Sequence, residues 1–186
     1  MRALAAVVAL VIVSSAAAAE SDRRFFPLQV ANEWTFEDTD FGGDSSMRVP
    51  WRRAGVFQLA GFPGASELRV RYSGETLQAW DQRQRRWEAL LRLGAAAGTT
   101  YQVYLPAPFW SGARVTVSSR RATAPNQVLR RSYKGTLRLV VRPPAGLSDA
   151  GVTGLWFAPR IGLVRWEEQS FTGPRVHVLS RVRIAG

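Results

Sequence analysis

Few side chains in this 186-residue chain are of the types that carry enzyme chemistry. His177 is the only histidine and there is no cysteine, which excludes thiolate nucleophiles, paired histidine ligands and cysteine-based zinc sites. A Ser-His-Asp triad through His177 remains arithmetically possible, but the sequence has no Gly-x-Ser-x-Gly elbow to hold the serine. We therefore interpret His177 as an ordinary, half-exposed strand residue and predict a protein that is not an enzyme and uses no metal or cofactor.

Acidic residues gather at two places. The stretch from Asp38 to Asp44 puts oxygen ligands around two glycines, as in a calcium loop, but Val49 occupies the twelfth position, where an EF-hand needs a glutamate. We interpret this stretch as a solvated hairpin turn. Glu167 and Glu168 are adjacent on a predicted strand and point to opposite sides, so they cannot act together as the carboxylate pair of a glycosidase.

Arginine dominates the charge of the chain. The sequence has 25 Lys and Arg residues against 14 Asp and Glu, a net charge of +11, and Lys134 is the only lysine. Basic residues alternate with apolar ones along several predicted strands. If Arg69, Arg71, Arg138 and Arg175 project from one side of a sheet, they form a positive face that attracts anions. The alternative is an ordinary solvated face, in which arginine is frequent only because a GC-rich genome favours arginine codons.

The seven tryptophans allow two interpretations. Aromatic rings can serve as platforms for sugars, but in a β domain without disulfides large aromatic side chains usually fill the core, and we favour the core. Phe109 and Trp110 are the exception, because prolines stiffen the segment around them and it reads as a loop. Exposed aromatic residues in such a loop would form an interaction site.

The N-terminus has the pattern of a secretory signal peptide. Arg2 precedes an apolar run from Ala3 to Val13, and alanines at 17–19 provide the small residues that signal peptidase requires. We expect cleavage before Glu20, which assigns 1–19 to a signal peptide and leaves no transmembrane segment. The protein is then exported to the periplasm or the exterior, where anionic envelope polymers or lipid headgroups are more accessible partners than nucleic acid.

The rest of the chain predicts antiparallel β structure in a single domain over 20–186. Apolar and polar residues alternate with period two, and Gly, Pro, Asn or Asp interrupts the pattern at short intervals. About eleven strands are expected, over 33–39, 56–60, 67–72, 76–81, 87–93, 99–105, 114–120, 136–142, 152–158, 162–169 and 175–184. Short connections favour a meander, and a twisted sheet of this size must curl or split. We predict a curved half-barrel or barrel-like sheet, with a β-sandwich as the alternative.

Three stretches resemble a broad group of secreted bacterial β-rich proteins, most of them uncharacterised. Residues 26–34, Phe-Pro-Leu-Gln-Val-Ala-Asn-Glu-Trp, resemble the opening Phe-Pro-Leu-x-x-Gly-Asn-x-Trp motif of that group. Residues 90–101 are similar to a middle segment, and 157–168 with Gly173-Pro174 are similar to a closing Ala-Pro-Gly-x-Gly-Leu-Val motif. The chain departs from the group at Ala31 and Arg160, where glycine is usual. The resemblance implies an extracytoplasmic β domain and provides no catalytic residues.

We therefore expect an exported, non-catalytic binding or envelope-associated domain whose ligand is an anionic polymer or lipid. The candidate ligand-binding residues are Arg69, Arg71, Phe109, Trp110, Arg138 and Arg175. A structural protein-interaction domain is the alternative, and a carboxylate-based hydrolase is the least favoured interpretation. A concavity lined by aromatic residues would favour the binding domain, and paired carboxylates in a cleft would favour the hydrolase.

Overall fold

One antiparallel sheet makes up the computed structural model, which describes residues 23–103, 113–142 and 151–185. The predicted signal peptide and the Phe109-Trp110 loop lie outside these described residues. Thirteen strands form along the described chain: β1 (Glu33–Asp38), β2 (Asp44–Arg48), β3 (Arg52–Arg53), β4 (Val56–Phe62), β5 (Ala65–Ser73), β6 (Thr76–Asp81), β7 (Arg86–Arg92), β8 (Thr100–Val103), β9 (Ala113–Asn126), β10 (Arg131–Arg142), β11 (Gly151–Ala158), β12 (Gly162–Ser170) and β13 (Gly173–Arg183).

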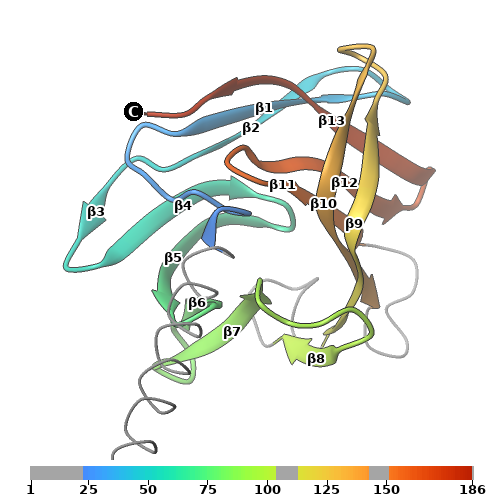
Figure 1. The fold of residues 1–186 in the computed structure, drawn as a ribbon. Helices are drawn as coiled ribbons and strands as arrows, with labels where there is room; N and C mark the ends of the chain where they lie inside the picture. Colours follow the sequence, from blue (N-terminus) through green and yellow to red (C-terminus); the bar gives the residue numbers. More distant parts are fainter. Residues whose placement is uncertain (1–22, 104–112, 143–150, 186) are drawn as a thin grey trace, which may run out of the picture.

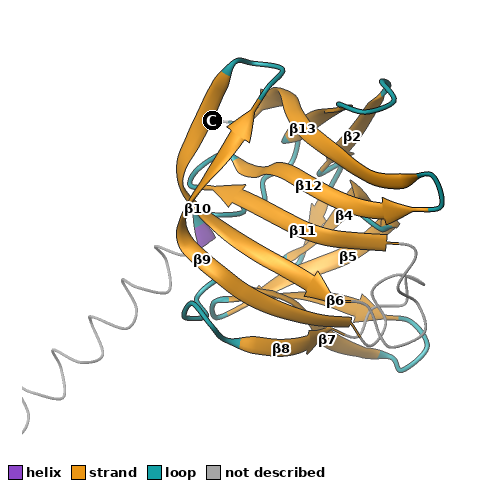
Figure 2. Ribbon diagram, turned by 90° about the vertical axis from the view of Figure 1, so that its right-hand side faces the viewer, coloured by secondary structure: helices purple, strands orange, loops and turns teal. Residues whose placement is uncertain are grey.

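The strands follow one another around a nearly closed barrel (Figures 1 and 2). Their order is β7-β6-β5-β4-β2-β1-β13-β12-β11-β10-β9-β8, with the short β3 paired to β4 outside this path. The strands at the two ends of this order, β7 and β8, contact each other without pairing, so the barrel is nearly closed. The all-β class and the curved, barrel-like sheet expected from the sequence are therefore confirmed, and the sandwich alternative is not what forms.

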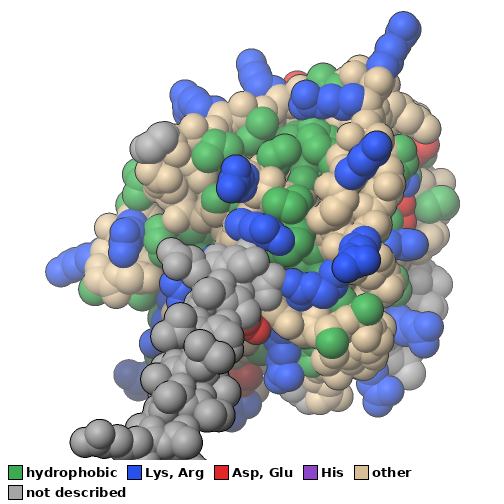
Figure 3. Space-filling view, in the orientation of Figure 1, with side chains coloured by type: hydrophobic (Ala, Val, Ile, Leu, Met, Phe, Trp, Pro, Cys, Tyr) green, Lys and Arg blue, Asp and Glu red, His purple; other side chains and the backbone are tan. Residues whose placement is uncertain are grey.

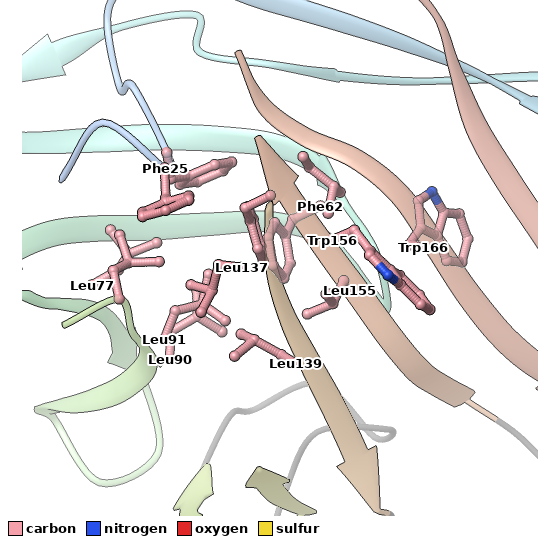
Figure 4. Close-up of a cluster of buried hydrophobic side chains, with 14 of the residues drawn as sticks. Phe25, Phe62, Leu77, Leu90, Leu91, Leu137, Leu139, Leu155, Trp156 and Trp166 are labelled. Carbon is pink, nitrogen blue, oxygen red and sulfur yellow. The ribbon is translucent and has the colours of Figure 1, made fainter. Parts of the chain in front are cut away.

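Alternation decides which side chains face the barrel interior. In β5, Leu68 and Val70 are buried while Arg69 between them is exposed, as the period-two pattern predicts. Apolar residues from most strands meet inside, and Figure 4 shows leucines of β6, β7, β10 and β11 converging there with Phe62. Burial of this apolar surface stabilises the fold without disulfide bonds.

The segment before β1 packs into the interior and fixes the start of the sheet. Phe26 is fully buried, lies 5.8 Å from the ring of Trp34, and meets Phe62 and Phe157 edge to face. The buried Asn32 side chain donates to the carbonyl oxygen of Pro27 at 2.6 Å and accepts from the amide of Ala185 at 2.8 Å. The Phe-Pro-Leu, Asn and Trp residues of the opening motif thus have structural roles.

Candidate functional site

A groove lies on the outer surface of the sheet, beside β3, β4, β5, β6 and β7. It consists of two adjoining hollows of about 880 and 630 Å³ that share Trp51, Arg69 and Trp80. Trp87 lines the larger hollow, and Gln58 and Glu67 line the smaller. We call the surface formed by these residues the tryptophan groove: Trp51, Gln58, Glu67, Arg69, Trp80 and Trp87.

Strand register explains why these side chains meet. Trp80 of β6 is directly opposite Trp87 of β7, and Gln58 of β4 is opposite Arg69 of β5. Val70 of β5 pairs with Ala79 of β6. In the same register the next pair along these two strands is Arg69 and Trp80, so these residues are also neighbours. Side chains at paired positions share a face, so two tryptophans, an arginine and an amide form one row on the outer face.

The aromatic rings of the groove are held in place. The rings of Trp80 and Trp87 are 5.4 Å apart and inclined by 63°. The guanidinium carbon of Arg71 lies 4.3 Å from the centre of the Trp87 ring, and Arg71 Nε donates to Gln78 Oε1 at 2.9 Å. Cation–π contact and the hydrogen bond fix Arg71 over Trp87. Trp51, which is 38% exposed, presents its ring to solvent.

The groove carries net positive charge. Three further arginines, Arg52, Arg53 and Arg83, line it together with Arg69, and all four are exposed. Among the described lining residues the only acid is Glu67. Arginines around low-dielectric aromatic walls attract anions and present planar donor pairs that match a carboxylate.

The four arginines singled out from the sequence lie at three separate places around the barrel. Arg69 and Arg71 lie together at the groove, whereas Arg138 lies on the outer face of β10, with its guanidinium carbon 4.9 Å from the Trp156 ring centre. Arg175 of β13 is half-buried, lies 4.6 Å from the ring centre of Phe41, and its Nη1 is 4.0 Å from an Asp38 carboxylate oxygen. Because the sheet curves through the strands that separate them, these residues do not form one continuous patch, and their binding of an anion stays a prediction.

The preference for core roles holds for only some of the tryptophans. Trp34, Trp156 and Trp166 are buried, but the tryptophans of the groove are partly exposed and belong to the outer surface. A sequence signal for this was present in β6, where Leu77 and Ala79 alternate with Gln78 and Trp80. The alternation assigns Trp80 to the polar, outward side.

His177 is buried, not half-exposed as the sequence pattern suggested. Its ring stacks on Trp166 with centroids 3.6 Å apart and planes inclined by 4°, and its Nε2 lies 3.3 Å from Glu168 Oε1. Glu167 points to the other side of β12, where it accepts hydrogen bonds from Arg165. The two adjacent glutamates thus face opposite sides, as expected, and each has a basic or imidazole partner.

The acidic turn after β1 uses its carboxylates to accept backbone hydrogen bonds. Asp38 Oδ1 accepts from the amides of Asp40 and Phe41, and Asp40 Oδ2 accepts from the amide of Val176. Burial alone would raise the pKa of Asp38, but these two amides and the charges of His177 and Arg175 lower it overall. In the described part of the chain, no three His, Asp or Glu side chains are grouped so that they could hold a metal ion.

Comparison with known proteins finds two similar solved structures. One, from Bacteroides fragilis, is named a "putative exported protein with YmcC-like fold"; it is 14% identical, with a TM-score of 0.44 over 86% of this chain and 99% of its own. The other, from Parabacteroides distasonis, is named a "putative lipoprotein"; it is 10% identical, with a TM-score of 0.42 over 86% and 98%. Neither name states a ligand or a reaction. No family model and no curated protein matches the sequence.

Within the described ranges, no helix has the length and apolar character needed to cross a membrane.

Proposed function

We propose that this protein is an exported, non-catalytic binding domain whose tryptophan groove holds an acidic sugar unit. The observation that carries the proposal is the presence of Trp51, Trp80 and Trp87 in one groove with exposed arginines. Aromatic rings offer flat apolar surface to the C–H face of a sugar, and arginine pairs with its carboxylate through two parallel hydrogen bonds.

The surroundings of the groove support recognition of a polar ligand. The amide of Gln58 is available beside Arg69 for sugar hydroxyls, and Glu67 at the smaller hollow can accept hydrogen bonds from them. The partly exposed Trp51 provides a ring that a ligand can cover. Such a mixture of aromatic walls and a few convergent polar groups is typical of small-ligand sites.

Binding is favoured over hydrolysis because the described lining of the groove lacks a pair of carboxyl groups. Glycoside hydrolysis uses two carboxyl groups flanking the scissile bond, at separations of about 5–10 Å. Glu67 is the only acid among the described residues that line the groove. The export part of the proposal is supported by the N-terminal pattern of Arg2, the apolar run and the alanines before Glu20.

Isothermal titration calorimetry with trigalacturonate and the neutral trisaccharide maltotriose tests the proposal. We expect saturable binding of trigalacturonate only, weakened about tenfold or more, equivalent to about 1.4 kcal/mol, by Trp51→Ala or by Arg69→Gln. Phe171→Ala, which removes a 94% exposed aromatic ring from the β12–β13 turn, and Arg181→Gln are the matched controls. Equal binding of both sugars, no binding of either, or equal losses in variants and controls would overturn the proposal.

A further inference from the structure

The β9–β10 hairpin has a charge composition unlike the rest of the chain. From Ala113 to Arg142 it contains eight Arg and Lys residues and no Asp or Glu, although the whole chain has 14 acidic residues. We call these residues, 113–142, the basic hairpin. In Figure 3, Lys and Arg side chains are spread over the face of the molecule that includes β9 and β10. The hairpin therefore contains no acidic residue of its own to offset its positive charge.

The exposed cations follow the length of the hairpin. Lys134, Arg138 and Arg142 are exposed on β10 at four-residue intervals, while Leu137 and Leu139 between them face the interior. Four residues of extended chain span at most about 14 Å, which sets the spacing between successive cations. The result is a line of charges along one strand.

A second cation reinforces one end of this line. Arg114 of β9 is directly opposite Arg142 of β10, and both are exposed. Like charges at opposed positions of an antiparallel pair destabilise the sheet. None of the ion pairs between described residues involves the basic hairpin. A bound anion between the two guanidinium groups would remove their repulsion.

We infer that the basic hairpin is a second contact surface for a long acidic polysaccharide, of which the tryptophan groove holds one unit. This inference builds on the proposed function, since it extends the ligand beyond the groove. In the order of strands around the barrel, only β8 separates β7, which carries Trp87, from the hairpin. A linear array of cations matches the regularly repeated carboxylates of an extended chain.

A membrane surface fits the hairpin less well. Interfacial lipid binding combines basic residues with apolar side chains that enter the bilayer. The large apolar side chains exposed among the described residues are Val30, Phe41, Trp51, Phe171 and Ile184, and none belongs to the hairpin. Beyond its pairing with β8 and β11, the hairpin continues towards its turn as a twisted, two-stranded ribbon and offers no flat surface there (Figure 1).

The test compares trigalacturonate with long polygalacturonate, using the chain from Glu20 to Gly186. One variant replaces Arg114, Arg121, Lys134 and Arg142 by glutamine. Its control removes the same charge from exposed sites that line neither surface, through glutamine at Arg48, Arg160, Arg181 and Arg183. The hairpin variant should bind the long polymer about tenfold or more weakly and trigalacturonate normally, and the control should bind both normally. The affinity for the polymer should exceed that for trigalacturonate by less as salt rises from 0.1 to 1 M, since the screening length falls from about 10 to 3 Å.

The two proposals fail in different ways. If the trisaccharide binds in the groove but the hairpin and control variants bind the polymer equally, the hairpin inference is wrong and the proposed function stands. If the trisaccharide does not bind but the polymer does, through the hairpin alone, the proposed function is wrong. Two further ligands complete the test: vesicles that contain phosphatidylglycerol and, separately, a DNA duplex. Hairpin-dependent binding to either that is stronger than binding to polygalacturonate would overturn the choice of a polysaccharide.

Discussion

Replacing Gly162 by alanine should destabilise the protein far more than the same change at Gly135. Gly162 has a φ of +97°, and a Cβ built there would lie 2.9 Å from Nε1 of the buried Trp34 and 3.1 Å from two carbons of its ring. Gly135 also has a positive φ, +68°, but nothing lies within 4 Å of its Cβ position. A side chain at either position would therefore be strained by the positive φ, but only at Gly162 would it also collide with packed atoms.

The magnitudes follow from these two contributions. A left-handed backbone costs a non-glycine residue about 1–2 kcal/mol, and added volume in a packed core costs about 1–3 kcal/mol more. Gly162→Ala is then expected to cost about 2–5 kcal/mol and Gly135→Ala about 1–2 kcal/mol. For a domain of this size each kcal/mol lowers Tm by about 2–4 °C.

Thermal denaturation followed by circular dichroism measures both effects. The near-ultraviolet spectrum should also change in Gly162→Ala, because the indole N–H of Trp34 donates to the Ile161 carbonyl at 2.5 Å and the new methyl group displaces it. Equal decreases in Tm for the two variants would refute the reasoning, since they would mean that contact with Trp34 contributes nothing.

Three further outcomes are expected. Ala31, with a φ of +72°, has a backbone conformation that favours glycine, so Ala31→Gly should raise the free energy of unfolding by up to about 1 kcal/mol in urea denaturation; a decrease would contradict this. Asp38→Asn should lower Tm at pH 7, because a carboxylate with a lowered pKa stabilises the fold while it is ionised. The difference in Tm between variant and wild type should therefore narrow as the pH falls below about 4. A constant difference in Tm between pH 7 and pH 3 would exclude a stabilising role of the Asp38 charge. His177→Ala should lower Tm and alter tryptophan fluorescence through loss of the stack on Trp166, yet leave trigalacturonate binding unchanged. Lost binding with unaltered Tm would contradict a purely structural role for this residue.

Most strands could be predicted because they alternate cleanly, and those that could not lack the pattern. Each of the eleven expected strands overlaps an observed one. Residues Asp44–Arg48 do not alternate clearly, since Met47 is the only buried residue among them, and β3 consists of two exposed residues. These two elements form because β1 and β4 offer them edges to pair with, which is a tertiary effect.

The candidate site was harder to predict because it depends on which strands become neighbours. Alternation correctly placed Arg69 and Arg71 on the outer side of β5, but not beside Trp80 and Trp87, whose proximity follows from pairing of β5, β6 and β7. Alternation also did not predict that Arg175 packs beside Asp38 and Phe41, which belong to a hairpin far away in sequence. Sequence periodicity gives the side of a strand, whereas the site requires the order of strands.

The strand order also determines how the barrel can assemble. Almost every strand on the path pairs with the strand just before or after it in the chain. β2 pairs with β4, the next but one, and a single pairing joins strands far apart in sequence. The exception joins β1 to β13, where Glu33 pairs with Arg183. Two meanders, 33–92 and 100–183, can therefore form from local contacts, and the entropy of closing one long loop is concentrated in a single step. Substitutions at the β1–β13 ladder are expected to slow folding if that closure belongs to the transition state, and only to speed unfolding if it comes later.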